Sequence, residues 1–227
     1  FLYTYEGSIV VLQHVDEPER LAVQAVVRVN APAEPDAAVG GKGHFTADGR
    51  RYINANWHTD SVFELDLEAG YRLTTLIAGG FSRPDDMVMT AGERKGYAAS
   101  YGRAPDLSAV HVFDLTERRI TRTLKVGRNP AGLTMSPDSR YAYVTNVAGA
   151  SFSAIDTQTD EVLYTASAAE QYRAAGITGD YLDIEGVTVS ADGSTLYAYA
   201  VNYGALVVFE GLSPNGVRCA RFIPGAV

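Results

Sequence analysis

The stretch SPDSRYAYVTN, from Ser136 to Asn146, decides the fold because it joins a tight turn directly to a strand. Pro137 presets the φ angle of the turn, and Asp138 can hydrogen-bond its own backbone two residues further on. From Tyr141 to Thr145, aromatic side chains alternate with smaller ones, which is the period of a strand with one packed face. Together with an expected short strand from Gly132 to Ser136, the stretch predicts a β-hairpin.

Similar stretches recur along the chain. The second reads KGHFTADGRRYINAN, the third DDMVMTAGERKGYAAS and the fifth EGVTVSADGSTLYAYAVN, whereas the first begins FLYTYEG and lacks its opening strand. Two further strand-like segments follow each copy. Equivalent positions lie 50, 44, 46 and 54 residues apart, at Glu6, Asn56, Ser100, Asn146 and Ala200. A period in the forties with four strands per unit predicts the blades of a β-propeller.

The fourth copy also carries a resemblance to a known family. SPDSRYAYVTN followed by IDTQTDEV resembles the YVTN family of β-propeller repeats, whose tetrapeptide stands here at residues 143–146. The match is close in the fourth copy, fair in the second and fifth, and weak in the first and third. The resemblance implies a ring that usually has seven blades. It also implies an extracytoplasmic location, periplasmic or secreted, although these residues contain no signal peptide.

We therefore expect an all-β chain that forms a single β-propeller domain of four-stranded antiparallel blades. The expected blades are 1–41, which is incomplete, 42–80, 81–127, 128–170 and 181–227. Five visible units favour part of a larger, seven-bladed ring whose flanking residues lie outside this chain. A closed five-bladed ring, with Phe222–Val227 as the missing innermost strand, is the alternative. Asn30–Gly41 is expected to be a surface loop, and Thr165–Gly176 to contain a short helix.

Composition excludes several classes of function. The net charge of −8 and the scattered Lys and Arg residues argue against nucleic acid or an anionic membrane as partner. No window approaches the roughly 18 consecutive apolar residues of a transmembrane helix, so a soluble chain is expected. Cys219 is the only cysteine, which excludes an internal disulfide and a multi-cysteine metal site. No nucleophile elbow, zinc-protease, phosphate-loop or haem-attachment motif is present.

In a propeller, the loops between blades and those between second and third strands converge on one face around the central channel. This rule gives eight candidate ligand-binding residues: His44, Trp57, His58, Arg83, Arg103, Arg128, Tyr181 and Asn202. Trp57 and His58 can form a stacking platform beside an acid/base group, or Trp57 can simply cap the space between two blades. His44 is expected in an innermost strand, either facing the channel as a ligand or satisfied by a neighbour.

Charged residues near the same mouth suggest two further sites. Arg83, Arg103 and Arg128 can clamp a carboxylate or phosphate, but pairing with Asp85, Asp86 and Asp106 is the simpler account. Asp180, Asp183 and Glu185 can bind a divalent cation together with His44 or His58, but their spacing fits no established metal loop, and a solvated acidic loop is the simpler account. No cofactor is predicted, and haem or a divalent cation is the alternative.

The preferred function is a non-catalytic binding or scaffold propeller that is not an enzyme by itself. Its funnel or rim would bind a small molecule, a polymer or a partner protein. The family resemblance also implies a redox alternative, because the same superfamily is similar to the large subunits of quinoprotein amine dehydrogenases and to the haem-binding propeller of nitrite reductase. His44 and His58 would then be axial or proton-transfer residues. A metal-dependent, lactonase-like hydrolase at the acidic mouth is the third alternative.

Overall fold

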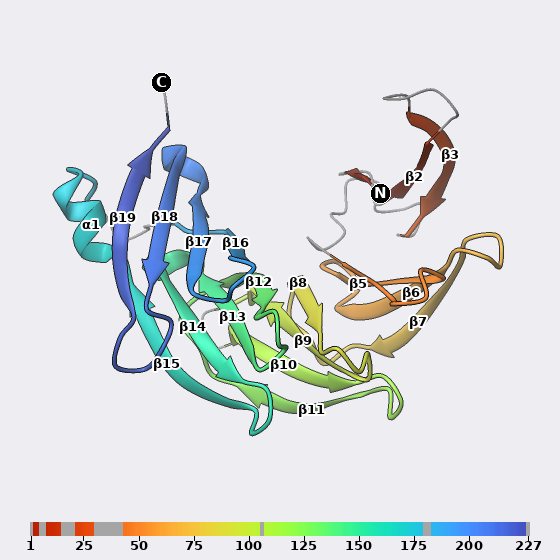
Figure 1. The fold of residues 1–227 in the computed structure, drawn as a ribbon. Coiled ribbons are helices and arrows are strands. Elements are labelled where there is room, and N and C mark those ends of the chain that lie inside the picture. Colours follow the sequence, from red (N-terminus) through yellow and green to blue (C-terminus); the bar gives the residue numbers. More distant parts are fainter. Residues whose placement is uncertain are drawn as a thin grey trace.

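The computed structural model describes residues 2–4, 8–14, 21–29, 43–104, 107–178 and 183–225, and these residues form an all-β fold. Their strands make one three-stranded and four four-stranded sheets, each with antiparallel neighbours in chain order. Figure 1 shows the five sheets along an open arc, with the first and last sheets at its two ends. The predicted all-β architecture of four-stranded propeller blades is therefore confirmed.

The first sheet contains β1 (Leu2–Thr4), β2 (Ser8–His14) and β3 (Leu21–Arg28). The second contains β4 (His44–Phe45), β5 (Arg51–Asn56), β6 (Ser61–Asp66) and β7 (Arg72–Ala78). The third contains β8 (Pro84–Met89), β9 (Lys95–Ser100), β10 (Ala109–Asp114) and β11 (Arg119–Leu124). The fourth contains β12 (Pro130–Met135), β13 (Tyr141–Asn146), β14 (Ser151–Asp156) and β15 (Glu161–Ser167). The fifth contains β16 (Gly186–Val189), β17 (Thr195–Ala200), β18 (Ala205–Glu210) and β19 (Arg218–Pro224).

The turn between the first two strands of each repeat is built as the sequence predicts. The Asp138 carboxylate accepts a hydrogen bond from the Ser136 hydroxyl at 2.6 Å and from the Arg140 backbone N–H at 3.0 Å. Ser139 has a φ of 57°, and the equivalent position is Gly49 in the second sheet and Gly193 in the fifth. A short polar side chain thus organises the turn, while the left-handed residue closes it.

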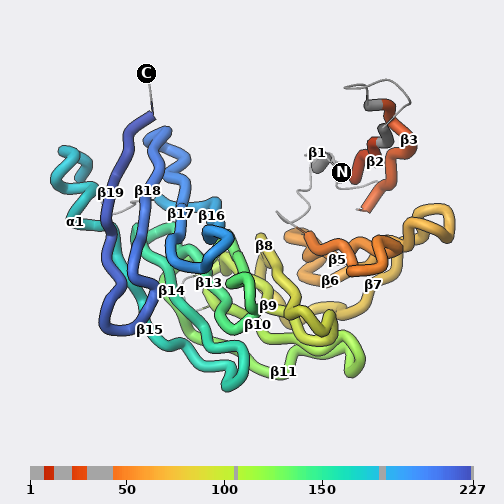
Figure 2. The backbone as a smooth tube through the Cα atoms, viewed as in Figure 1, coloured from red at the N-terminus to blue at the C-terminus, as the bar shows by residue number. Residues whose placement is uncertain are grey.

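Each inner sheet packs on the following sheet through one face and on the preceding sheet through the other. We call the face that meets the following sheet in the chain the forward face, and the opposite one the backward face. On the forward face of the fourth sheet, Tyr143 and Phe152 are buried in one cluster with Leu196 and Val207 of the fifth sheet. The innermost strands β8, β12 and β16 follow one another around the central channel (Figure 2).

Polar contacts also join neighbouring sheets. The Asp86 carboxylate on β8 accepts the backbone N–H of Leu133 on β12 at 2.9 Å. The Thr145 hydroxyl donates to the backbone carbonyl of Glu185, just before β16, at 2.7 Å. Lys95 on β9 forms a 2.9 Å ion pair with Asp160 in a turn of the fourth sheet. These contacts hold neighbouring sheets together at their junctions.

Three expectations about irregular segments have different outcomes. The predicted short helix is present as α1 (Ala169–Ala174), but β15 extends to Ser167 before it begins. The suggestion that Phe222–Val227 supplies an innermost strand is wrong, because Phe222 and Ile223 in β19 pair with β18 as the outermost strand of the fifth sheet. The Asn30–Gly41 loop lies outside the described residues.

Candidate functional site

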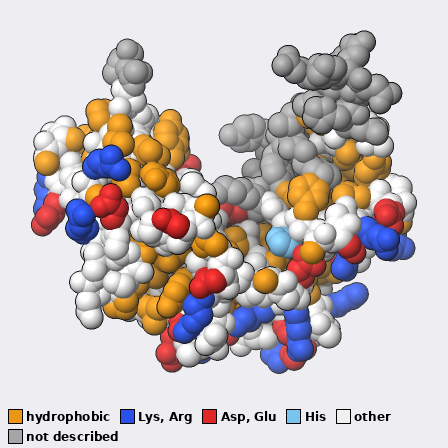
Figure 3. Space-filling view, in the orientation of Figure 1, with side chains coloured by type: hydrophobic (Ala, Val, Ile, Leu, Met, Phe, Trp, Pro, Cys, Tyr) orange, Lys and Arg blue, Asp and Glu red, His pale blue; other side chains and the backbone are white. Residues whose placement is uncertain are grey.

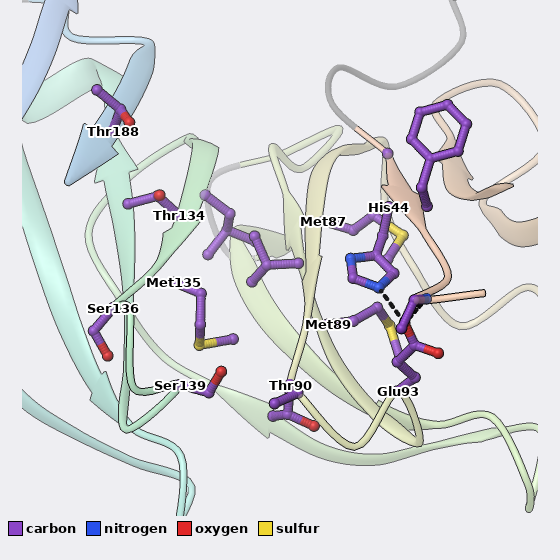
Figure 4. Close-up of a pocket in the computed structure, with 16 residues that line it drawn as sticks. His44, Met87, Met89, Thr90, Glu93, Thr134, Met135, Ser136, Ser139 and Thr188 are labelled. Atoms are coloured by element: carbon purple, nitrogen blue, oxygen red, sulfur yellow. Dashed lines mark hydrogen bonds and ion pairs between the residues drawn. The ribbon is translucent and has the colours of Figure 1, made fainter. Parts of the chain in front are cut away.

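A chamber opens on the central channel between the innermost strands. Its volume is about 590 Å³, and it is lined by β4, β8, β12, β16 and the turns that follow the first three of these strands. This volume lies within the range of about 300 to 1,000 Å³ that is usual for small-molecule sites. Figure 4 shows His44 and Glu93 on one side of the chamber, with Thr134, Met135 and Ser139 on the other.

His44 and Glu93 form the charged part of the chamber wall. The His44 Nε2 atom lies 3.1 Å from Glu93 Oε1, and their side chains are 30% and 25% exposed. The same carboxylate oxygen accepts the backbone N–H of Ala47 at 2.6 Å. Because an ionised carboxylate only accepts hydrogen bonds, Nε2 carries the proton in this contact. The Nδ1 atom of neutral His44 is then an acceptor, and in Figure 4 it faces the chamber.

The opposite wall offers hydroxyl groups. Among the described residues, the hydroxyls of Thr134, Thr188 and Ser139 have no hydrogen-bond partner, whereas that of Ser136 is bound to Asp138. Met135 and Val88 add half-buried apolar surface between them. The chamber therefore combines one oriented imidazole, several free hydroxyls and an apolar patch, which is a typical composition for binding a small polar molecule.

Two acidic residues, Asp85 and Glu185, lie near the start of the innermost strands β8 and β16, away from the turns that line the chamber. Asp85 lies where the pairing of β8 with β9 is shifted between Pro84 and Asp86, so it is the extra residue of a β-bulge. Burial, together with the nearby charge of Glu185, raises the pKa of Asp85 to about 6. Partial desolvation and the charge of Asp183 also raise the pKa of Glu185. An acidic pair thus occupies equivalent positions of β8 and the segment entering β16.

Two of the three predicted metal ligands can be placed. Asp183 is fully buried, and its Oδ2 accepts the backbone N–H of Asn202 at 2.8 Å, while its Oδ1 has no partner. Glu185 is exposed, and Asp180 lies outside the described residues. Within the described part of the chain, no three His, Cys, Asp or Glu side chains are arranged to hold a metal ion.

The loop after β5 bridges the second and third sheets. The Trp57 ring lies 5.4 Å from the Tyr101 ring between centroids, and the Arg83 guanidinium lies 5.5 Å from the Trp57 centroid. Trp57 therefore packs across the junction of two blades. His58 is exposed, and its backbone N–H bonds the Asn56 side chain at 2.9 Å.

The structure gives Arg103 a carboxylate partner that was not among those expected. Arg103 forms a 2.9 Å ion pair with Asp60, whose other carboxylate oxygen accepts the Arg83 backbone N–H at 2.8 Å. Asp86 binds backbone N–H groups instead, and Asp106 is outside the described residues. The reason is geometric: Asp60 reaches Arg103 across the blade junction, while Asp86 points into the stack of innermost strands.

The remaining candidates do not meet in one place. Arg128 donates to the backbone carbonyl of Ala148 at 3.2 Å, and Asn202 is exposed in the loop after β17. Tyr181 lies outside the described residues. His44 was grouped with the loops that contain Trp57, but its side chain turns to Glu93 near the opposite end of the blades. The expected funnel therefore separates into an interlocked loop cluster around Trp57 and the His44 chamber.

Sequence reasoning missed Glu93, which positions His44. The sequence contained a signal, because Glu93 occupies the turn position that Gly49 and Gly193 hold in other repeats. The structure shows that Glu93 is left-handed there, with a φ of 52°. A bulky residue that retains an unfavourable backbone conformation often marks a functional site. The buried His111 was also missed: burial lowers its pKa to about 4, and its ring packs edge-on against Phe81.

Comparisons with known proteins support the fold. No protein-family model and no curated protein matches the chain. A solved structure titled Kuenenia stuttgartiensis hydrazine synthase is similar, with a TM-score of 0.63, 23% sequence identity and 81% of this chain covered. The match spans 48% of that chain, so this chain corresponds to about half of its length. Among the described residues, no helix is long and apolar enough to cross a lipid bilayer. The comparison supports the β-propeller architecture.

Proposed function

We propose that this chain is a non-catalytic binding propeller whose central chamber takes a small polar ligand or a polar segment of a partner protein. The observation that carries the proposal is His44, held by Glu93 with its second nitrogen toward a chamber of about 590 Å³. A carboxylate partner fixes both the tautomer and the orientation of an imidazole. His44 would accept a hydrogen bond from the ligand, and Thr134 and Thr188 would bind its other polar groups.

A thermal-shift screen of small sugars, polyols and amines tests this proposal. Compounds that raise the melting temperature of the wild-type chain should lose their effect on His44→Ala and Thr134→Ala. They should keep it on His58→Ala, the matched control, because His58 is exposed in a loop away from the chamber. The proposal would be contradicted if every effective compound stabilised His44→Ala and Thr134→Ala as much as the wild-type chain.

A redox-linked propeller is the second candidate. It is favoured by His44, since an imidazole whose other nitrogen donates to a carboxylate is the usual form of a metal- or haem-ligating histidine. The fold likeness to hydrazine synthase is consistent with this candidate but extends to the fold alone. A coloured preparation whose visible bands disappear in His44→Ala would favour it over the first proposal, as would co-purification of a second chain.

We also propose that the chain belongs to the YVTN family and is extracytoplasmic. The support for the family is the tetrapeptide at residues 143–146 and the matching turns of the second and fifth sheets. The location follows only from the family. Fractionation of cells that express the native protein tests it, and recovery in the cytoplasmic fraction alone would contradict it.

A further inference from the structure

The connection between the fourth and fifth sheets is longer than the two other connections that the structure describes in full. Residues 79–83 join β7 to β8 and residues 125–129 join β11 to β12, whereas residues 168–185 join β15 to β16. The longer connection contains α1, which contacts the outermost strand β19 (Figure 1). Segments added to a rigid scaffold often carry binding residues. This connection adds such a segment at the outer rim of the fifth sheet.

Two side chains of α1 fix it to the fifth sheet. Tyr172 is fully buried, and its ring meets those of Tyr203 and Phe222 at 5.5 and 4.9 Å between centroids. The Gln171 Nε2 atom donates to the backbone carbonyl of Cys219 in β19 at 3.1 Å. Because an aromatic cluster and a hydrogen bond both hold α1 in place, the surface between α1 and β19 has a defined shape.

That surface contains a groove of about 620 Å³ between the end of α1 and β19, which we call the α1 groove. Its volume is in the range of small-molecule sites. It is lined by the alanines Ala174, Ala175 and Ala220 and by the half-buried rings of Tyr203 and Phe222. Figure 3 shows hydrophobic side chains gathered over the sheet that contains β19, on the side of the molecule where α1 lies. Small side chains beside aromatic rings suit a flat, mainly apolar molecule.

One polar atom at the α1 groove has no partner. Because a backbone carbonyl only accepts hydrogen bonds, the contact with Cys219 fixes the Gln171 amide with its nitrogen toward β19. The Gln171 Oε1 atom is buried and, among the described residues, accepts no hydrogen bond. A buried acceptor without a donor is unfavourable and rare in native proteins. Since Gln171 lines the groove, a bound molecule with an N–H group would supply the missing donor.

We propose that the α1 groove binds a small aromatic molecule with one hydrogen-bond donor, of the indole class. Its ring would pack against Ala175 and Phe222 and extend the cluster around Tyr172, in which the rings already meet edge-on. Its N–H group would donate to Gln171 Oε1. This site is separate from the chamber and independent of the function proposed for it, because no residue lines both.

Titration of the native protein with 5-fluoroindole, followed by the fluorine NMR signal of the ligand, tests the inference. We expect a dissociation constant of about 0.1 to 1 mM, which is typical of a ligand with so few atoms. In 5-fluoro-1-methylindole a methyl group replaces the N–H hydrogen, so this probe should bind the wild-type chain about 10-fold more weakly. The two probes should bind Gln171→Leu equally, because the acceptor is gone.

A second variant tests the position of the ligand. Ala175→Phe should abolish binding because it fills the α1 groove. The matched control is Ala69→Phe, in an exposed turn of the second sheet, which should bind 5-fluoroindole as the wild-type chain does. Both alanines are exposed, so neither substitution should change the melting temperature much. If Ala175→Phe fails to fold, Ala174→Phe fills the same groove.

The inference would be overturned if neither probe bound the wild-type chain at millimolar concentrations, or if both probes bound it equally. Binding that survives in Ala175→Phe would also overturn it. If binding were lost in His44→Ala and kept in Ala175→Phe, the probe would occupy the chamber and the α1 groove would have no role in its binding.

Discussion

Replacing Tyr143 with alanine tests the stacking of the sheets directly. Tyr143 is 2% exposed at the junction of the fourth and fifth sheets, where its ring meets Phe152 edge-on at 5.9 Å between centroids. A buried aromatic side chain removes roughly 150 Å² from water, which at about 25 cal/mol per Å² is worth about 4 kcal/mol. Alanine leaves a cavity, so we expect the free energy of unfolding to fall by about 3 to 5 kcal/mol.

The fifth sheet provides a matched control at the equivalent position. Tyr197 is only half-buried because its face is open, so Tyr197→Ala in the 227-residue chain should cost less than about 1 kcal/mol. Tyr143→Phe keeps the ring and should also cost less than about 1 kcal/mol.

Guanidinium unfolding, followed by the fluorescence of Trp57 and by circular dichroism, measures all three variants. If Tyr143→Ala and Tyr197→Ala destabilised this chain equally, the assignment of forward-facing positions would be wrong.

Three further predictions concern charge and metal. Asp85 has a pKa of about 6 when folded, against 3.8 for the ordinary group, so it favours folding below about pH 4 and loses this contribution as the pH rises through 6. Asp85→Asn should therefore raise the melting temperature at pH 7 but not at pH 4; an equal shift at both pH values would contradict this. The hydrogen bond from Arg140 lowers the pKa of Asp156 to about 2, so its contribution is present above about pH 4 and is lost as the pH falls through 2. In Asp156→Asn, the stability measured by circular dichroism should therefore fall less steeply as the pH is lowered toward 2. An unchanged dependence of stability on pH would argue against the ion pair between Arg140 and Asp156. EDTA should leave the melting temperature unchanged, and a large fall would reveal a structural metal.

The fold was predictable because it depends on local and repeated features. Turn residues such as Asp138, and the alternation in Tyr141 to Thr145, are read within a single repeat and then found again in the others. The structure places a strand or a turn at each of these positions in the fourth sheet. Repetition turned a weak signal from one hairpin into a reliable prediction of architecture.

The site was less predictable because its contacts cross between blades. His44 was recognised, but Glu93 lies 49 residues away and reaches it only after two sheets have stacked. Asp60, the partner of Arg103, was missed for the same reason, since it belongs to the preceding sheet. Which strand position faces which neighbour follows from the twist and spacing of the assembled sheets, and a single sequence does not contain these distances.

The turn that carries Glu93 has a mechanical consequence. One carboxylate oxygen of Glu93 binds both Ala47 and His44 of the second sheet, so it closes the seam between two blades and also aims the imidazole. A molecule that hydrogen-bonds Nδ1 would hold the ring in place and tighten this seam, whereas one that draws His44 away would loosen it. If the chamber binds a ligand as proposed, its occupancy and the separation of these two blades would be coupled through the Glu93 side chain.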